Sequence, residues 1–241
     1  GLFCLIPLLY FFYKYSHKKR SLYKYLSIFF LVCLQGAIGW YMVESGLVDC
    51  IDVSHYRLAT HLSLAFIILS ITFWYILENL KIENYKYTIP FPLLSTILIL
   101  IFLQIILGAF LAGLDGGLIY NTWPDMNGDF LPNDSNTNIF LSKEAFNTPS
   151  IVQFIHRKIA YLLLFFVLYF NFIYLKKKLP IMPLLIFNFA IFFQICLGII
   201  TLLSGAKILY ASLHQIGSIL VVSSFLLILY KNFKTNLPLS G

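Results

Sequence analysis

Six long apolar runs constrain this chain more than any other feature of its sequence. They cover residues 25–43, 58–77, 91–113, 151–175, 181–203 and 210–230. As α-helices, runs of this length cross the hydrocarbon core of a bilayer, which is about 30 Å thick. The runs lack the alternation of apolar and polar residues that barrel strands need. With 60% hydrophobic and only 11% charged residues, the chain is predicted to be an all-α, polytopic transmembrane helical bundle.

A shorter apolar run occupies residues 2–13, at the start of the chain. As a helix it would measure only about 20 Å, which is too short to span a bilayer. It has neither the preceding basic region nor the following cleavage site of a signal peptide. Because the chain starts at Gly1 rather than at a methionine, we expect this run to be the end of a truncated transmembrane helix.

The loops on the two sides of the membrane differ in their content of charged residues. If every long run crosses the membrane, most of the basic residues fall on one side. They are Lys14, Lys18, Lys19, Arg20, Lys24, Lys81, Lys86, Lys176, Lys177, Lys178, Lys231 and Lys234. Only two acidic residues, Glu78 and Glu83, share that side, and the other acidic residues lie opposite. The positive-inside rule places the basic side, and with it the C-terminus, in the cytoplasm or in an organelle matrix. The net charge of +7 then reflects topology, and no nucleic-acid partner is expected.

An internal repeat relates the two halves of the chain. The pattern Gln, Gly four residues later and Ser-Gly ten residues after the Gln begins at Gln35 and again at Gln194. Each copy is followed by a loop and then by an apolar run that carries a histidine, His61 or His214. The same shift predicts a fourth histidine just before Gly1, as the counterpart of His156. A third Gln-x-x-x-Gly begins at Gln104, and helix packing with glutamine as an interhelical donor is the simplest role for all three.

Three of the five histidines share one predicted depth in the membrane. His61, His156 and His214 each lie a few residues inside a run that enters from the acidic, outer side. Ionisable groups are costly within a membrane, so three of them at one depth favour a functional role over simple packing. His17 and His55 lie in or beside loops, and we expect both to be solvated or interfacial.

Haem is the group that best fits paired imidazoles in an apolar bundle. The runs offer no carboxylate or thiolate at ligand spacing, which disfavours zinc and copper sites. Haem needs axial histidines, an apolar cleft between helices and cations for its propionates. Arg57, one helical turn before His61, and Arg157, beside His156, are candidate propionate-binding residues. The sequence contains no Cys-x-x-Cys-His, so c-type attachment is excluded.

The only long outer loop, residues 115–150, is rich in Gly, Asn, Asp and Pro. Loops of this length are commonly functional or disordered. Its composition suits a lid over a site in the outer leaflet, although anchoring by Trp123 at the membrane interface would also explain it.

Six segments spread along the chain carry a more specific signal. They are residues 35–47, 56–62, 112–126, 154–157, 194–203 and 214–215. Together these segments resemble the haem A synthase family of proteobacteria and mitochondria. The resemblance implies eight transmembrane helices in two pseudo-symmetric four-helix bundles, each of which holds a haem between two histidines. It also implies conversion of haem O to haem A, through successive hydroxylations of the C8 methyl group that yield a formyl group.

Carried onto this chain, the resemblance implies two domains. Residues 1–88 would form the N-terminal, substrate-haem bundle, without its first helix and the start of its second. Residues 89–241 would form the C-terminal bundle, with haem b as cofactor. His156 and His214 would ligate the iron of haem b, and His61 would ligate the substrate haem. The family's Glu-x-x-His-Arg segment has no counterpart here, so the chain alone is expected to be inactive as an oxidoreductase.

The implied partners are haem O and membrane lipid, with a haem O synthase and an electron acceptor as candidate protein partners. The implied location is the cell inner membrane, or the mitochondrial inner membrane in a eukaryote. Two other functions stay open on the residues alone. One is a bis-histidine b-type cytochrome, although such relays usually stack haems across both leaflets. The other is a small-solute transporter, which would need more polar groups at mid-depth.

Overall fold

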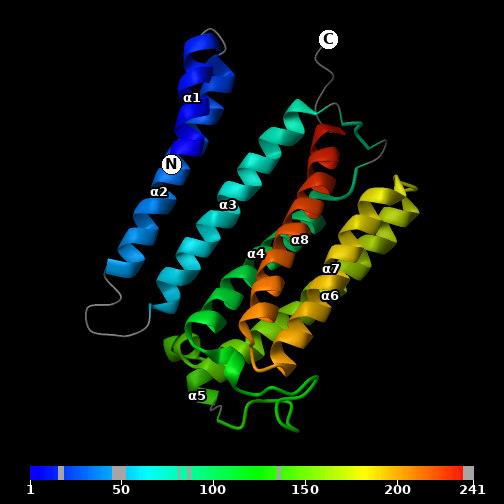
Figure 1. Cartoon of the computed structure of the whole chain (residues 1–241). Helices are drawn as coiled ribbons and strands as arrows, with labels where there is room; N and C mark the ends of the chain where they lie inside the picture. Colours follow the sequence, from blue (N-terminus) through cyan, green and yellow to red (C-terminus); the bar gives the residue numbers. More distant parts are fainter. Residues whose placement is uncertain (16–18, 45–52, 81, 86–87, 135–136, 236–241) are drawn as a thin grey trace.

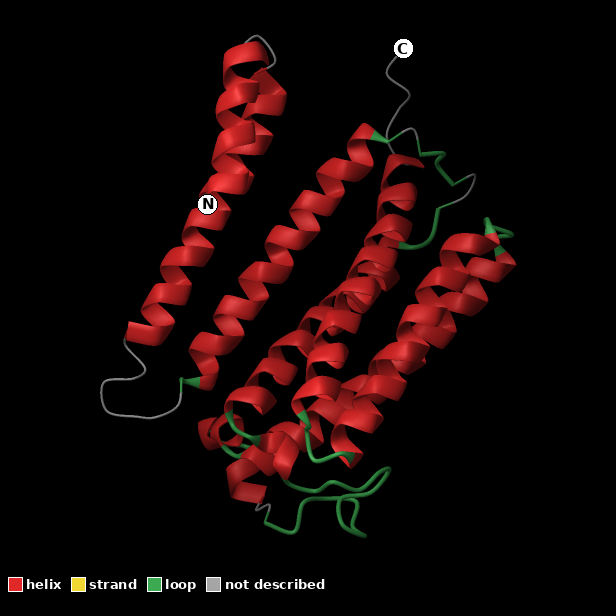
Figure 2. Cartoon of the chain, in the orientation of Figure 1, coloured by secondary structure: helices red, strands yellow, loops and turns green. Residues whose placement is uncertain are grey.

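The computed structural model describes residues 1–15, 19–44, 53–80, 82–85, 88–134 and 137–235. These residues form helices and loops, without a strand (Figure 2). The elements are α1 (Leu2–Tyr15), α2 (Lys19–Glu44), α3 (His55–Asn79), α4 (Phe91–Gly113), η1 (Gly116–Leu118), α5 (Thr137–Phe140), η2 (Lys143–Asn147), α6 (Pro149–Lys176), α7 (Ile181–Leu203) and α8 (Ile208–Thr235).

Six of these helices, α2, α3, α4, α6, α7 and α8, are long and apolar enough to cross a membrane. They coincide with the six predicted runs, which confirms the polytopic helical fold. The main difference is at α2, which begins at Lys19 rather than near residue 25. Lysine and arginine are good helix formers, and their long side chains can reach the polar interface, so the basic segment continues the helix.

Proline and glycine set several helix boundaries. Pro90 and Pro180 are the residues before α4 and α7, and Pro149 is the first residue of α6, where a missing backbone N–H costs nothing. At the end of α7, Gly205 adopts a φ of 68°, a left-handed conformation that glycine adopts without strain. The Ser-Gly of the repeat therefore ends a helix here, and its first copy, Ser45-Gly46, lies outside the described residues.

The long helices run alternately up and down. The helices α3, α6 and α8 begin at one end of the molecule, where α2, α4 and α7 finish (lower part of Figure 1). We call this the outer end, because it bears the acidic loop between α4 and α6. The opposite end carries the described basic residues Lys19, Arg20, Lys176, Lys177 and Lys178. The alternation agrees with the predicted order of crossings.

Helix contacts define a C-terminal bundle of α4, α6, α7 and α8, against which α3 packs through α4 and α8. The helix α2 packs on α3, and α1 packs on α2. Within the bundle, α4 packs on α6 and α8, and α7 packs closely on α8. The helices α6 and α8 are not among the closely packed pairs. They therefore face each other across the bundle.

The main hydrophobic core fills the half of this bundle away from the outer end. On α6 the core cluster starts at Val167, and on α8 it starts at Val221. Its centre is aromatic, since Phe187 contacts Phe170 and Phe225 with ring centroids 6.0 and 5.2 Å apart. The outer halves of α6 and α8, where their histidines lie, are outside this cluster.

The segment between α3 and α4 is anchored on the C-terminal bundle. The hydroxyls of Tyr85 and Tyr174 lie 3.0 Å apart. The Asn232 side chain accepts a hydrogen bond from the Ile89 N–H at 2.6 Å and donates one to the Ile89 carbonyl at 3.1 Å. Tyr85 thus packs with the second bundle, although it precedes the predicted domain boundary between residues 88 and 89, which stays a prediction.

Candidate functional site

The three predicted histidines occupy corresponding positions in the structure. His61 lies in the second turn of α3, His156 in the second turn of α6 and His214 in the second turn of α8. All three helices begin at the outer end (Figure 1). The side chain of His55, by contrast, packs edge-on against Phe110, with ring centroids 5.4 Å apart. His17 lies outside the described residues.

His156 and His214 lie at corresponding depths on α6 and α8, and each ring lies against the glycine of a neighbouring helix, Gly108 or Gly198. The Nδ1 atom of each ring is buried without a hydrogen-bond partner. The His214 ring also lies within hydrogen-bonding reach of the Gln194 backbone on α7, so Nδ1 is the nitrogen without a partner in both rings.

These observations fit a haem between the two rings. An unpartnered imidazole nitrogen in an apolar interior is costly unless another group uses the ring. The α6 and α8 helices do not pack closely on each other, and the main core cluster does not include their outer halves. Because the porphyrin already binds the iron of haem, the protein needs to supply only the axial ligands. In the described chain, no group of three or more His, Cys, Asp or Glu side chains could hold a metal ion directly.

His61 has a different environment. The Gln35 amide nitrogen lies 3.2 Å from its Nδ1 and 3.1 Å from its Nε2. The guanidinium of Arg57, one turn earlier on α3, lies 5.2 Å from the centroid of the Tyr41 ring on α2. The Gln35 amide therefore contacts the His61 ring, and the Arg57 guanidinium contacts α2 one turn nearer the outer end.

Arg157 is buried, and its guanidinium points into the outer loop. One terminal nitrogen donates to the carbonyls of Thr122 and Asp125, at 3.0 and 2.7 Å. The other donates to the Tyr120 carbonyl at 2.7 Å and to the Gln153 side chain at 3.1 Å. Only Nε is buried without a partner. In the structure the guanidinium of Arg157 holds the loop, and propionate binding by this residue stays a prediction.

Further contacts fix the first part of this loop over α6 and α7. The Gln153 amide donates to the carbonyls of Gly116 and Ile119, at 3.0 and 2.7 Å. The Asn121 amide donates to the Leu202 carbonyl at the end of α7, at 2.9 Å. The Gly128 N–H donates to the Asp125 carboxylate, which lowers the pKa of that carboxyl group. The loop is therefore tied to both helices at the outer end.

Each of the three histidines also meets a Gln-x-x-x-Gly motif on a neighbouring helix. The motifs are evident in the sequence, but their contacts with the histidines are not. The signal was present, since every motif lies on the long helix just before a histidine-bearing one. The pairs are Gln35 with His61, Gln104 with His156 and Gln194 with His214.

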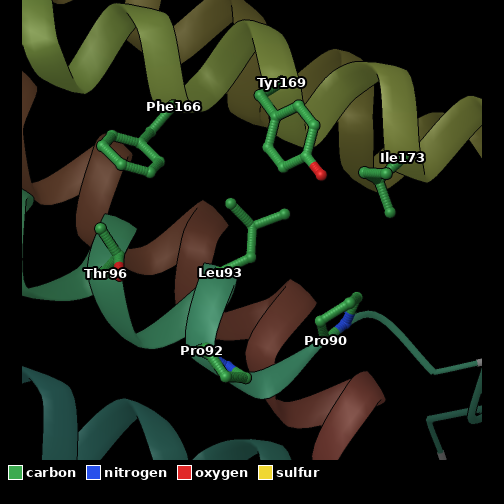
Figure 3. Close-up of a pocket in the computed structure, with 7 residues that line it drawn as sticks. All are labelled: Pro90, Pro92, Leu93, Thr96, Phe166, Tyr169 and Ile173. Atoms are coloured by element: carbon green, nitrogen blue, oxygen red, sulfur yellow. The ribbon is translucent and has the colours of Figure 1, made fainter.

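The two best-formed pockets of the structure lie elsewhere. One, of about 310 Å³, opens between α4 and α6, where Phe166, Tyr169 and Ile173 point toward Leu93 (Figure 3). The other, of about 410 Å³, lies between α1 and α2. Neither is lined by any of the three histidines.

Comparison with known proteins shows the family to which the chain belongs. The sequence model of the COX15-CtaA family, described as cytochrome oxidase assembly protein, matches residues 1–226. The chain belongs to this family. Its COX15-CtaA relatives include the heme A synthase of Pelagibacter ubique (strain HTCC1062), which is 60% identical over 96% of this chain and 69% of the relative. The heme A synthase of Rickettsia bellii (strain RML369-C) is 40% identical over 92% of this chain and 68% of the relative. The resemblance inferred from the sequence is confirmed.

Proposed function

We propose that this protein is a membrane oxidoreductase of haem A biosynthesis, which converts haem O into haem A. The relatives named heme A synthase match nearly the whole chain, at up to 60% identity. The observation that carries the proposal is the pair of imidazoles on α6 and α8, each with an unpartnered buried nitrogen. A haem between the two helices would use both imidazoles.

In this proposal, His156 and His214 are the axial ligands of a resident haem b. When bound, haem b would supply one-electron transfer. His61 belongs to the site of the substrate, haem O, whose C8 methyl group is oxidised by successive hydroxylations to a formyl group. Oxidation of a methyl group removes electrons, so the reaction also needs an electron acceptor.

The chain's own residues bind and orient these groups. Arg57 lies at the outer end beside His61, where its guanidinium can bind a propionate of the substrate haem. Arg157 holds the loop over the outer end of α6, which limits access of water to the C-terminal site. Its remaining donor, Nε, can serve a propionate of haem b, because the other donors are already engaged.

The proposed location is the cell inner membrane, or the mitochondrial inner membrane in a eukaryote, with the C-terminus on the cytoplasmic or matrix side. The distribution of basic residues supports this orientation. The histidines then lie near the outer leaflet. A haem O synthase is the partner that would deliver the substrate.

The test is haem analysis of membranes from cells that express the full-length gene, because the residues of this chain alone are expected to be inactive. The cells should make haem O but lack a haem A synthase of their own. Mass analysis of extracted haem should detect haem A. The His61→Ala variant should lose haem A yet retain protein-bound haem b, since the two sites lie on different helices. His55→Gln is the matched control on the same helix, and it should retain haem A.

Two results would contradict the proposal. Haem b without any haem A from the wild-type gene would favour a b-type cytochrome that only transfers electrons. Unchanged haem A in the His61→Ala variant would remove His61 from the substrate site.

A further inference from the structure

The three Gln-x-x-x-Gly motifs share one geometry toward the histidines. In each pair, the glutamine Nε2 donates to the main-chain carbonyl of the histidine. The distances are 3.0 Å from Gln35 to His61, 2.9 Å from Gln104 to His156 and 2.9 Å from Gln194 to His214. Residues four apart lie on the same face of a helix, so the glycine of each motif faces the same histidine.

The glycines lie directly against the imidazole rings. A Cβ atom built on Gly198 would lie 3.0 Å from Cε1 of His214, and one on Gly39 would lie 3.0 Å from Cε1 of His61. At Gly108 the corresponding distance to Cε1 of His156 is 3.6 Å, an ordinary contact. The backbone of the helix that carries each motif therefore lies against one histidine ring. This contact is closest at His61 and His214.

Helix packing alone does not account for the glutamines. The Oε1 atoms of Gln35 and Gln194 are buried without a hydrogen-bond partner, which costs free energy that an apolar side chain would avoid. The glutamine side-chain amide instead lies where its N–H donates to the main-chain carbonyl of the histidine. That bond fixes the height and the rotation of the histidine-bearing helix at the residue that carries the ring.

We propose that the Gln-x-x-x-Gly motifs are positioning devices for the haem-ligating histidines. Gln104 and Gln194 hold the backbone of His156 and His214, and Gly198 sets the plane of the His214 ring. Gln35 and Gly39 do the same for His61. The inference rests on the proposed function, because it takes these histidines to be haem ligands.

The repeat supports this role independently of any one contact. The built Cβ atoms of Gly39 and Gly198 lie at nearly the same distances from all three nearest ring atoms of their histidines. These distances are 3.0, 3.5 and 3.8 Å at His61, and 3.0, 3.5 and 3.7 Å at His214. Two helix pairs far apart in the sequence thus keep one arrangement around one residue type.

The first experiment compares alanine variants of the purified, haem-containing protein. Gly198→Ala should shift the low-spin EPR signal and the midpoint potential of the bound haem, because the new Cβ pushes the His214 ring. Gly108→Ala should cause a smaller shift, since its Cβ makes only an ordinary contact. Gly36→Ala is the control, because nothing lies within 4 Å of its built Cβ.

The second experiment separates positioning from packing at the glutamine. Gln194→Met keeps the length of the side chain but removes the donor, so it should shift the same EPR signal or lower the haem content. Gln194→Glu should restore both, since a carboxyl group in an apolar interior stays neutral and donates its O–H. Equal effects of the two variants would show that the donor is not the cause.

The outcomes distinguish this inference from the proposed function. A wild-type protein without bound haem overturns both. A haem-containing wild type with unchanged EPR signals in Gly198→Ala and Gln194→Met overturns only the positioning role. Loss of haem from Gln194→Met with recovery in Gln194→Glu supports it.

Discussion

Arg157 neighbours a proposed axial ligand in the sequence, yet its guanidinium serves the outer loop. Side chains of adjacent residues on a helix diverge by about 100°, so His156 and Arg157 face different surroundings. The loop carbonyls of Tyr120, Thr122 and Asp125 converge on the two terminal nitrogens of Arg157. A displacement of this loop would therefore move Arg157, which is adjacent to the proposed axial ligand His156.

Replacement of this residue should loosen the loop. In Arg157→Lys, one ammonium cannot reach the carbonyls that the planar guanidinium spans, and the loss is expected to be about 2 kcal/mol. Hydrogen exchange at residues 116–126 should become faster, by roughly 30-fold. Lys158→Met is the control, because the Lys158 ammonium lies over the ring of Phe130, a loop residue outside the measured segment 116–126. Exchange at wild-type rates in Arg157→Lys would contradict the assigned role.

The histidines of the candidate site and their depth in the membrane could be predicted from the sequence. Their hydrogen-bond partners on neighbouring helices could not. His61, His156 and His214 were recognised because an ionisable group within an apolar run is costly wherever the helix packs. The bond from Gln104 to His156 depends on the rotation of α4 against α6, which hydrophobic runs do not specify. The orientation of Arg157 likewise depends on the course of an irregular loop.

At the scale of elements, polar pairs join helices that share few other contacts. The helices α6 and α7 lie side by side but pack loosely. Their side-chain amides at Asn171 and Asn188 bond reciprocally, at 2.9 and 3.2 Å. Each amide satisfies the other, so the pair can lie within the apolar bundle without an unpaired group.

A double-mutant cycle should reveal this pairing. Asn171→Leu alone should destabilise the protein by about 1 kcal/mol, because it leaves the Asn188 amide without its partner. The double variant Asn171→Leu, Asn188→Leu should recover most of that loss. Reversible unfolding in detergent gives the three free energies. Additive losses in the double variant would show that the two amides do not interact.

The helices themselves could be predicted well because their length and hydrophobicity are local properties. The six runs became α2, α3, α4, α6, α7 and α8. The boundaries were less predictable, as the early start of α2 at Lys19 shows. Basic residues end an apolar run in the sequence but do not end a helix.

At the scale of the whole molecule, the C-terminal bundle divides into two halves with different roles. The half away from the outer end holds the aromatic core around Phe170, Phe187 and Phe225. The outer half holds the two histidines and the loop fixed by Arg157. The tightly packed half keeps the helices together, and the outer half carries the histidines that we propose as haem ligands.

The absorption spectrum of the purified protein tests this account most directly. We expect the spectrum of a low-spin, bis-histidine b-type haem, and the pyridine haemochrome assay should give its content per chain. His156→Ala and His214→Ala should each lower that content sharply, whereas His55→Gln should not. Unchanged haem b content in the His156→Ala and His214→Ala variants would contradict the central claim that this pair holds the haem.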